Sequence, residues 1–174
     1  MPNRRLLWIV LMVCVVVMSC GLGRAQKRAG AAPDPALHID VPVTLAKANI
    51  VMDIGHAVYV GDMPFVLGDL RLLATKYNDG TTKGKVVAIV HGDAAFFVLN
   101  DETYNANRHV DTGNPYLKII RGLIAHGIQI ELCGATAVAN HWGNANLIPG
   151  VLVNTDAMVR VTQLEQQGYT LIYE

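Results

Sequence analysis

The chain has 174 residues, of which 52% are apolar, 6% aromatic and 16% charged, and its formal net charge is zero. This apolar fraction excludes an intrinsically disordered chain, and three cysteines are too few for a disulfide scaffold. A neutral charge balance argues against nucleic acid as a partner, because phosphate binding needs a basic surface. The length fits one domain of ordinary size, preceded at most by a tail.

The first 25 residues contain the three parts of an export signal in order. Arg4 and Arg5 form a short basic region, the run from Leu6 to Met18 is entirely apolar, and small residues follow. This run is shorter than the roughly 20 apolar residues of a membrane-spanning helix. We therefore expect a signal peptide over residues 1–25 and a periplasmic or secreted mature protein, with a retained N-terminal anchor as the alternative.

Two cleavage sites remain open. Residues 23–25 (GRA) offer small residues at the spacing that ordinary signal peptidase needs, and we favour this site. Cys20, in the run VMSC, resembles the lipidated cysteine of a bacterial lipoprotein, which would anchor the mature chain to a membrane. Residues 26–45 are expected to form a flexible tether, because their first part is rich in Ala, Pro and charge.

The rest of the chain alternates between predicted strands and predicted helices. Short, β-branched apolar runs predict strands that are covered on both faces. In chain order the predicted elements are strand 48–54, helix 63–77, strand 85–90, a helical turn at 94–99, helix 115–126, strand 128–133, helix 135–142, strand 151–154, helix 156–167 and strand 169–173. This alternation implies parallel pairing, so the predicted fold class is α/β, a three-layer α/β/α sandwich with a mainly parallel sheet of about five strands.

Local signals set the ends of several of these elements. Asp62 is a candidate N-cap for the helix at 63–77, with Pro64 in its first turn. Thr155 or Asp156 is expected to cap the helix at 156–167. Residues 100–114 are polar and lack apolar periodicity, so we expect a long loop that serves as a lid, a binding loop or an oligomer contact.

Three residues with reactive side chains follow predicted strands: His56, His91 and Cys133. In open α/β sheets, ligands bind at the carboxyl ends of the strands. Because the strands are expected to be parallel, these three side chains are expected at one edge of the sheet. The sequence therefore predicts a functional site at this edge.

Cys133 is the candidate nucleophile, because it is followed by Gly134 and the start of a helix. A thiol at a helix N-terminus meets unpaired N–H groups and the positive end of the helix dipole, and both favour a thiolate. Gly134 is a candidate substrate-binding position, since glycine lets the backbone approach the sulfur or its adduct. The alternative is an inert cysteine that fills the core as a small apolar residue.

His91 is the second candidate catalytic residue, as an acid or base beside the thiol or as a donor to an anion. The alternative is a histidine hydrogen-bonded to the backbone at the end of a strand. Gly92 and His56 are candidate substrate-binding positions, although a structural role is preferred for His56. No metal and no cofactor is expected, because metal-ligand spacings, Walker, GxGxxG and GxSxG motifs are absent from the sequence.

Several segments carry a family resemblance. They are NPY at 114–116, GIQIELCG at 127–134, LIPGV at 147–151 and QLEQQGY at 163–169, together with VVAIVHG at 86–92. These segments resemble the DsrE/DsrF family of sulfur-relay proteins, over roughly residues 46–174. The resemblance implies a sandwich on a five-stranded parallel sheet, trimers or hexamers, and in some members a persulfide on the cysteine at the position of Cys133.

Two functions are compatible with this reading. The first is an exported sulfur carrier or transferase that holds a persulfide on Cys133 and exchanges sulfur with a donor or acceptor protein. The second is a non-catalytic oligomeric module that binds a small anion, a metal or a protein partner at the strand ends. A Cys–His hydrolase ranks third, because no acid that orients His91 can be assigned. Known relay members are cytoplasmic, whereas this chain carries an export signal, with membrane contact only through that signal or a lipidated Cys20.

Overall fold

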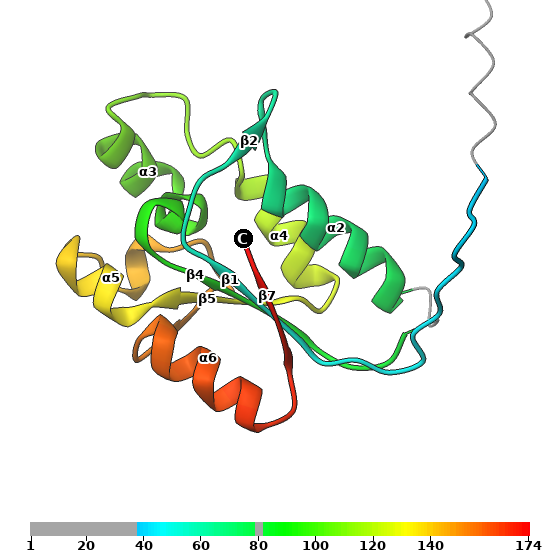
Figure 1. Cartoon of the computed structure of the whole chain (residues 1–174). Helices are drawn as coiled ribbons and strands as arrows, with labels where there is room; N and C mark the ends of the chain where they lie inside the picture. Colours follow the sequence, from blue (N-terminus) through cyan, green and yellow to red (C-terminus); the bar gives the residue numbers. More distant parts are fainter. Residues whose placement is uncertain (1–37, 79–81) are drawn as a thin grey trace, which may run out of the picture. The chain divides into compact units, whose positions relative to one another are not determined.

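Five short strands pair in parallel to form one sheet, in the order β6-β5-β4-β1-β7 (Figure 1). The strands are β1 (Ile50–Ile54), β4 (Val86–Val90), β5 (Gln129–Cys133), β6 (Leu152–Asn154) and β7 (Thr170–Tyr173). Every residue of the central strand β4 is buried, as expected for a strand covered on both faces. The five predicted strands are thus all present.

The connections contain helices and one small hairpin. These elements are β2 (Tyr59–Val60), β3 (Met63–Pro64), α2 (Phe65–Asn78), the 3-10 helix η1 (Gly92–Val98), α3 (Asp101–Arg108), α4 (Leu117–Ala125), α5 (Gly134–Ala139), the 3-10 turn η2 (Asn144–Asn146) and α6 (Ala157–Gln166). The antiparallel pair of β2 and β3 is separate from the main sheet.

The computed structural model describes residues 38–78 and 82–174, and residues 43–174 form one compact unit. Residues 38–42 belong to a second unit, and all five are exposed. The expected export signal over residues 1–25, with both cleavage sites, lies outside the described residues.

Within the described ranges, no helix is both long and apolar enough to cross a membrane.

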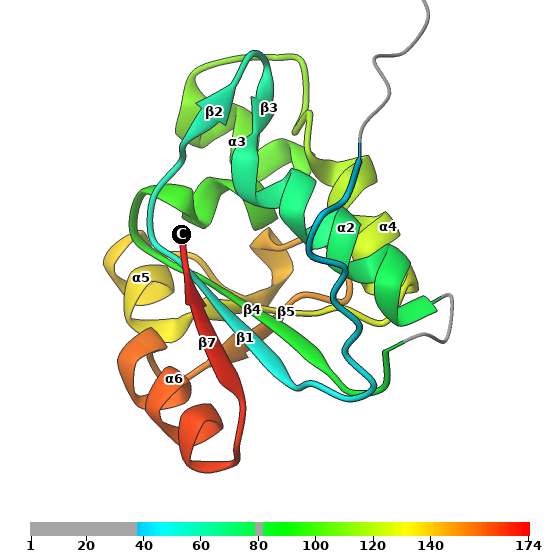
Figure 2. The same cartoon turned by 45° about the vertical axis from the view of Figure 1, so that its right-hand side comes forward.

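Alternation along the strands separates two apolar cores. Ile50, Met52 and Ile54 of β1 belong to the larger core, which also contains the buried residues of α2, α4 and η1. Val51 of β1 belongs to a smaller core with Val161 and Leu164 of α6. Figures 1 and 2 show α2 and α4 over one face of the sheet and α6 over the other. The predicted three-layer α/β/α sandwich is confirmed.

The sequence interpretation was wrong about residues 100–114, because they contain the helix α3. Asn100 caps this helix by accepting a hydrogen bond from the Thr103 backbone N at 2.9 Å. Asp101 accepts a hydrogen bond from the Asn114 backbone N at 2.7 Å, which ties the helix to the segment before α4. Periodicity missed α3 because its residues are mostly polar, and capping stabilises it instead.

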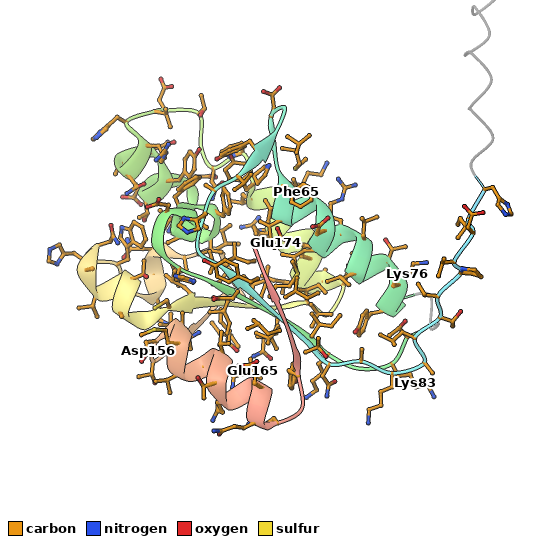
Figure 3. The ribbon with its side chains drawn as sticks, viewed as in Figure 1. Phe65, Lys76, Lys83, Asp156, Glu165 and Glu174 are labelled. Atoms are coloured by element: carbon orange, nitrogen blue, oxygen red, sulfur yellow. The ribbon has the colours of Figure 1, made fainter. Side chains whose placement is uncertain are left out.

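The start of α2 also differs from the prediction. Pro64 lies in the strand β3, and the helix begins at Phe65, so Asp62 is not its N-cap. By contrast, Asp156 does cap α6, since its carboxylate accepts a hydrogen bond from the Val159 backbone N at 2.8 Å. Figure 3 shows Asp156 at the start of this helix and Glu165 near its end.

Candidate functional site

A cavity of about 590 Å³ opens at the carboxyl ends of the strands, and we call it the strand-end cavity. Its walls come from segments after β1 and β4, from the end of α3 and from the region after α5. The lining residues are His56, Ala57, Tyr59, Gly92, Asp93, Phe96, Asn107, Arg108, Asn140 and Trp142. This cavity therefore lies at the edge of the sheet where the fold class predicts a binding site.

Arg108 lines this cavity, and its guanidinium stays positively charged over the whole working pH range. It is the last residue of α3, and its guanidinium carbon lies 4.5 Å from the centroid of the Phe96 ring. This stacking orients the guanidinium by a cation–π interaction. Arg108 forms no ion pair within residues 38–78 and 82–174. One of its donors is hydrogen-bonded to the neighbouring Tyr104, and a guanidinium has further donors with which it can bind an anion.

An aromatic cluster supports this wall of the cavity. Phe96 packs edge-to-face against Phe97, with ring centroids 4.7 Å apart, and both rings contact Tyr116. The Tyr116 hydroxyl lies 3.1 Å from the Tyr59 hydroxyl. Burial, reinforced by this hydrogen bond, raises the pKa of Tyr116 far above its usual value, so Tyr116 stays neutral. The wall behind Arg108 is therefore packed and uncharged.

His91 directly precedes Gly92 of the cavity lining, and its side chain is held by a residue of β1. Its Nε2 atom lies 2.9 Å from Oδ1 of Asp53, and the two side chains are 28% and 18% exposed. A Cβ atom at Gly55 would lie 2.8 Å from Cε1 of His91, so the imidazole covers this glycine. Asp53 is thus the acid that orients His91.

Gly92 is required by backbone geometry as well as by its place at the cavity. Its φ of 52° is in the left-handed region, and a Cβ atom there would lie 3.0 Å from the Gly55 carbonyl oxygen. Its backbone N donates a hydrogen bond of 3.3 Å to Oγ1 of Thr136 in α5. Gly92 therefore connects the end of β4 to the helix after β5.

Cys133 does not line the strand-end cavity. Its side chain is buried, at 5% exposure, in the smaller core beneath α6. The sulfur accepts a hydrogen bond of 3.3 Å from the backbone N of Ala157, the first residue of α6. The thiol thus contacts the start of α6, and Cys133 is not among the residues that line the cavity.

Cys133 and His91 occupy neighbouring strand ends, but their side chains are held by different partners. Val90 pairs with Leu132, so the next residues along the two parallel strands are His91 and Cys133. His91 bonds to Asp53 on β1, on the opposite side from β5. The structure therefore brings these two candidate catalytic residues to one edge without a hydrogen bond between them.

Close packing of the backbone requires glycine at position 134. A Cβ atom at this position would lie 2.4 Å from the Asn154 carbonyl oxygen and 2.8 Å from the Thr155 carbonyl oxygen. Glycine therefore allows the start of α5 to pass close to the backbone that leads into α6. The space next to Gly134 is filled by this chain and is closed to a ligand.

Of the predicted site residues, the structure brings His56 and Gly92 together in the cavity, whereas His91, Cys133 and Gly134 are not among its lining residues. Sequence reasoning missed Asp53, although a carboxylate within the apolar run 48–54 was a signal. It also missed Asn107 and Arg108, because their helix was interpreted as a loop. The cap at Asn100 and the acidic residues after it were the signal for that helix.

In the described part of the chain, no three His, Cys, Asp or Glu side chains are grouped closely enough to hold a metal ion.

The fold and the strand-end site together define an α/β sandwich protein with a ligand-sized hollow at the carboxyl edge of a parallel sheet. The model of the DsrE/DsrF-like family matches residues 47–173, so this chain belongs to that family. The family is associated in general with sulfur relay.

Two solved structures show the same fold. The protein of unknown function MTH1491 from Methanobacterium thermoautotrophicum is 14% identical, with a TM-score of 0.55 over 74% of this chain and 99% of that chain. The ychN protein from E. coli is 18% identical, with a TM-score of 0.54 over 73% of this chain and 99% of that chain. A search of the curated proteins found no match.

Proposed function

We propose that this chain is a binding protein for a small anion, held in the strand-end cavity by Arg108. The observation that carries the proposal is a guanidinium stacked on Phe96 at a cavity wall, without an ion-pair partner among the described residues. Asn107, Asn140 and His56 line the same cavity and add hydrogen-bond donors. A hollow of about 590 Å³ has the size of a small-molecule site.

The association of the family with sulfur relay makes a sulfur oxyanion the first ligand to test. Thiosulfate and sulfate carry the same charge, but only thiosulfate contains a sulfane sulfur. Comparing the affinities for the two anions separates recognition of the charge from recognition of the sulfane sulfur. Binding in this cavity needs no covalent step, which agrees with the position of Cys133 outside it.

Arg108→Ala is expected to weaken thiosulfate binding at least tenfold, because a charge-assisted hydrogen bond contributes about 1.5–3 kcal/mol. Isothermal titration calorimetry of the purified full chain measures this difference. Arg121→Ala is the matched control, since Arg121 is an exposed arginine on α4 that does not line the cavity. Equal affinity of Arg108→Ala and the parent protein would overturn the assignment.

A second candidate is the sulfur carrier that acts through Cys133, and the contact of its sulfur with the Ala157 N–H favours it. An N–H group at the start of a ten-residue helix stabilises negative charge on sulfur. In such a step the thiolate attacks the sulfane sulfur of thiosulfate, an S–S bond forms on Cys133, and sulfite leaves with the electron pair of the broken S–S bond. Burial of the thiol opposes this function, because donor and acceptor must reach the sulfur.

The carrier function predicts a mass increase of one sulfur atom after incubation with thiosulfate or polysulfide, lost in Cys133→Ser. Because Cys133 is buried, we expect no such adduct on the folded protein, and slow alkylation that accelerates when urea unfolds the chain. Intact-protein mass spectrometry measures both. A stoichiometric adduct on the folded protein would make the carrier the better proposal, while Cys133→Ser should leave anion binding unchanged.

We further propose that this protein acts outside the cytoplasm and that it forms a homo-oligomer. Export is supported by the basic residues and apolar run within residues 1–25. Self-association is supported by the edge strand β6, where Leu152 and Val153 are 50% and 39% exposed. Val159 of α6, which lines the same hollow as these two residues, is 61% exposed. A trimer or hexamer, as the family resemblance implies, would cover these side chains.

A further inference from the structure

A second hollow, of about 1060 Å³, is lined by residues of α2 and α4, the two helices that lie over one face of the sheet in Figure 2. We call it the α2–α4 groove, and it shares no lining residue with the strand-end cavity. Its apolar lining includes Leu72 of α2, and Ile119 and Leu123 of α4. Leu72 is 68% exposed, so this groove presents a large apolar side chain to solvent.

Two helical glycines, Gly68 and Gly122, line the groove, one on each helix. Glycine inside a helix costs about 1 kcal/mol relative to alanine. A Cβ atom at either position would meet nothing within 4 Å, so neither glycine is needed for packing within this chain. Their effect is to leave the two helix backbones accessible to a molecule that lies in the groove.

The ionisable residues that line the groove are all basic. Arg71 lines it from α2, and Lys118 and His126 line it from the two ends of α4. None of the three forms an ion pair in the described ranges. The excess of basic residues is local to the groove, because residues 46–174 as a whole contain twelve Asp and Glu against nine Lys and Arg. Charge complementarity therefore selects an anionic occupant.

We propose that the α2–α4 groove docks an acidic amphipathic helix of a partner protein. The lining of α2 runs from Gly68 to Thr75, a separation of seven residues, or about 10 Å along the axis. This length equals the span of the i to i+7 anchors with which a helix binds in a groove. In this complex, apolar side chains of the partner helix contact Leu72 and Ile119. Its glutamates face Arg71 and Lys118, and the two glycines of the groove allow the backbone of the partner helix to approach α2 and α4.

Fluorescence anisotropy with labelled helical peptides tests this docking. The probes are a panel of stapled 14-residue peptides with leucine at i, i+3, i+4 and i+7 and glutamate at the flanking positions. The matched control peptides carry lysine in place of each glutamate. We expect saturable binding of acidic peptides to the full chain, at least tenfold weaker binding of the lysine versions, and weakening of binding at high salt.

Variants locate the binding site. Gly122→Leu fills the groove and Arg71→Glu reverses a rim charge, and each is expected to weaken the acidic peptide at least tenfold. Arg121→Glu is the control, because it makes the same charge change on α4 outside the groove lining. Circular dichroism shows whether each variant is folded. Gly68→Ala adds only one methyl group to the groove, so it gives a second measurement of peptide binding with minimal risk to folding.

Three results would overturn the proposal. The first is that no acidic peptide of the panel binds. If decanoate binds at the groove and no peptide does, the site would be assigned to a small amphiphile. The second is equal binding to the parent protein and to Gly122→Leu. The third is dissociation of a homo-oligomer by Gly122→Leu in analytical ultracentrifugation, which would assign the groove to a second copy of this chain. Thiosulfate binding in the strand-end cavity is independent of all three.

Discussion

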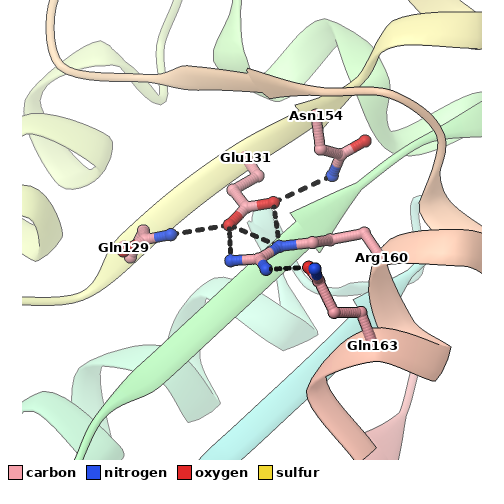
Figure 4. A network of polar contacts seen from close by, with 5 residues as sticks. All are labelled: Gln129, Glu131, Asn154, Arg160 and Gln163. Atoms are coloured by element: carbon pink, nitrogen blue, oxygen red, sulfur yellow. Dashed lines mark hydrogen bonds and ion pairs between the residues drawn. The ribbon is translucent and has the colours of Figure 1, made fainter. Parts of the chain in front are cut away.

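Replacing Arg160 with alanine is expected to lower the free energy of unfolding by about 3–5 kcal/mol, because it leaves the carboxylate of Glu131 buried without a counter-charge. Glu131 lies on β5 and is 3% exposed. Arg160 donates to it from Nη2 at 2.8 Å, and from Nε at 3.1 and 3.0 Å to the two carboxylate oxygens. Figure 4 shows this pair together with Gln129, Asn154 and Gln163.

The surrounding amides complete the network. Gln129 and Asn154 donate to the carboxylate at 2.6 and 3.0 Å, and Gln163 accepts a hydrogen bond from Arg160. Burial by itself raises the pKa of Glu131, but the hydrogen bonds from Arg160, Asn154 and Gln129 outweigh it and hold the pKa below the ordinary value of 4.5. Removing Arg160 therefore removes the largest of the contributions that keep Glu131 charged.

The sign of the pH dependence follows from this lowered pKa. A carboxyl group whose pKa is lower in the folded state contributes stability above its unfolded pKa, and loses it as the pH falls through the folded value. The contribution of Glu131 is therefore present above about pH 4.5 and decreases below it. The deficit of Arg160→Ala should be largest at pH 7 and should shrink in acid.

Urea unfolding followed by circular dichroism measures these differences at pH 7 and at pH 4. The double variant Glu131→Gln/Arg160→Ala is the control, because it removes the buried charge together with its partner. It should be more stable than Arg160→Ala alone. A loss below 1 kcal/mol for Arg160→Ala at pH 7 would contradict a buried, paired Glu131.

Gly134→Ala is expected to cost about 2–3 kcal/mol, in the range of overpacked sites. The added methyl group would lie 2.4 Å from the Asn154 carbonyl oxygen, and backbone at this distance must move. Gly68→Ala is the matched control, because its methyl group meets nothing within 4 Å and alanine favours the helix. Urea midpoints compare the two variants. If Gly134→Ala kept full stability and lost thiosulfate binding, Gly134 would be a ligand-binding position after all.

The two glycines at the strand ends show why spacing alone did not separate packing from binding. The pair Cys133-Gly134 and the pair His91-Gly92 look alike in the sequence, since each joins a reactive side chain to a glycine after an apolar run. The fold separates them, because Gly92 lines the strand-end cavity whereas Gly134 packs against the backbone before α6.

The five strands of the sheet, their parallel pairing, the helices α2, α4, α5 and α6 between them, and the family followed from the sequence by itself. Continuous apolar runs of four to seven residues are local, and strand–helix alternation leaves few ways to cover both faces of a sheet. Tertiary structure alone decided which side chains share a site. The strand order β6-β5-β4-β1-β7 places His91 next to Asp53, from a strand more than thirty residues earlier in the chain. Side-chain alternation turns Cys133 toward α6, and the polar helix α3 brings Arg108 to the cavity. Such contacts depend on register and on packing between distant segments, which no local pattern of residues contains.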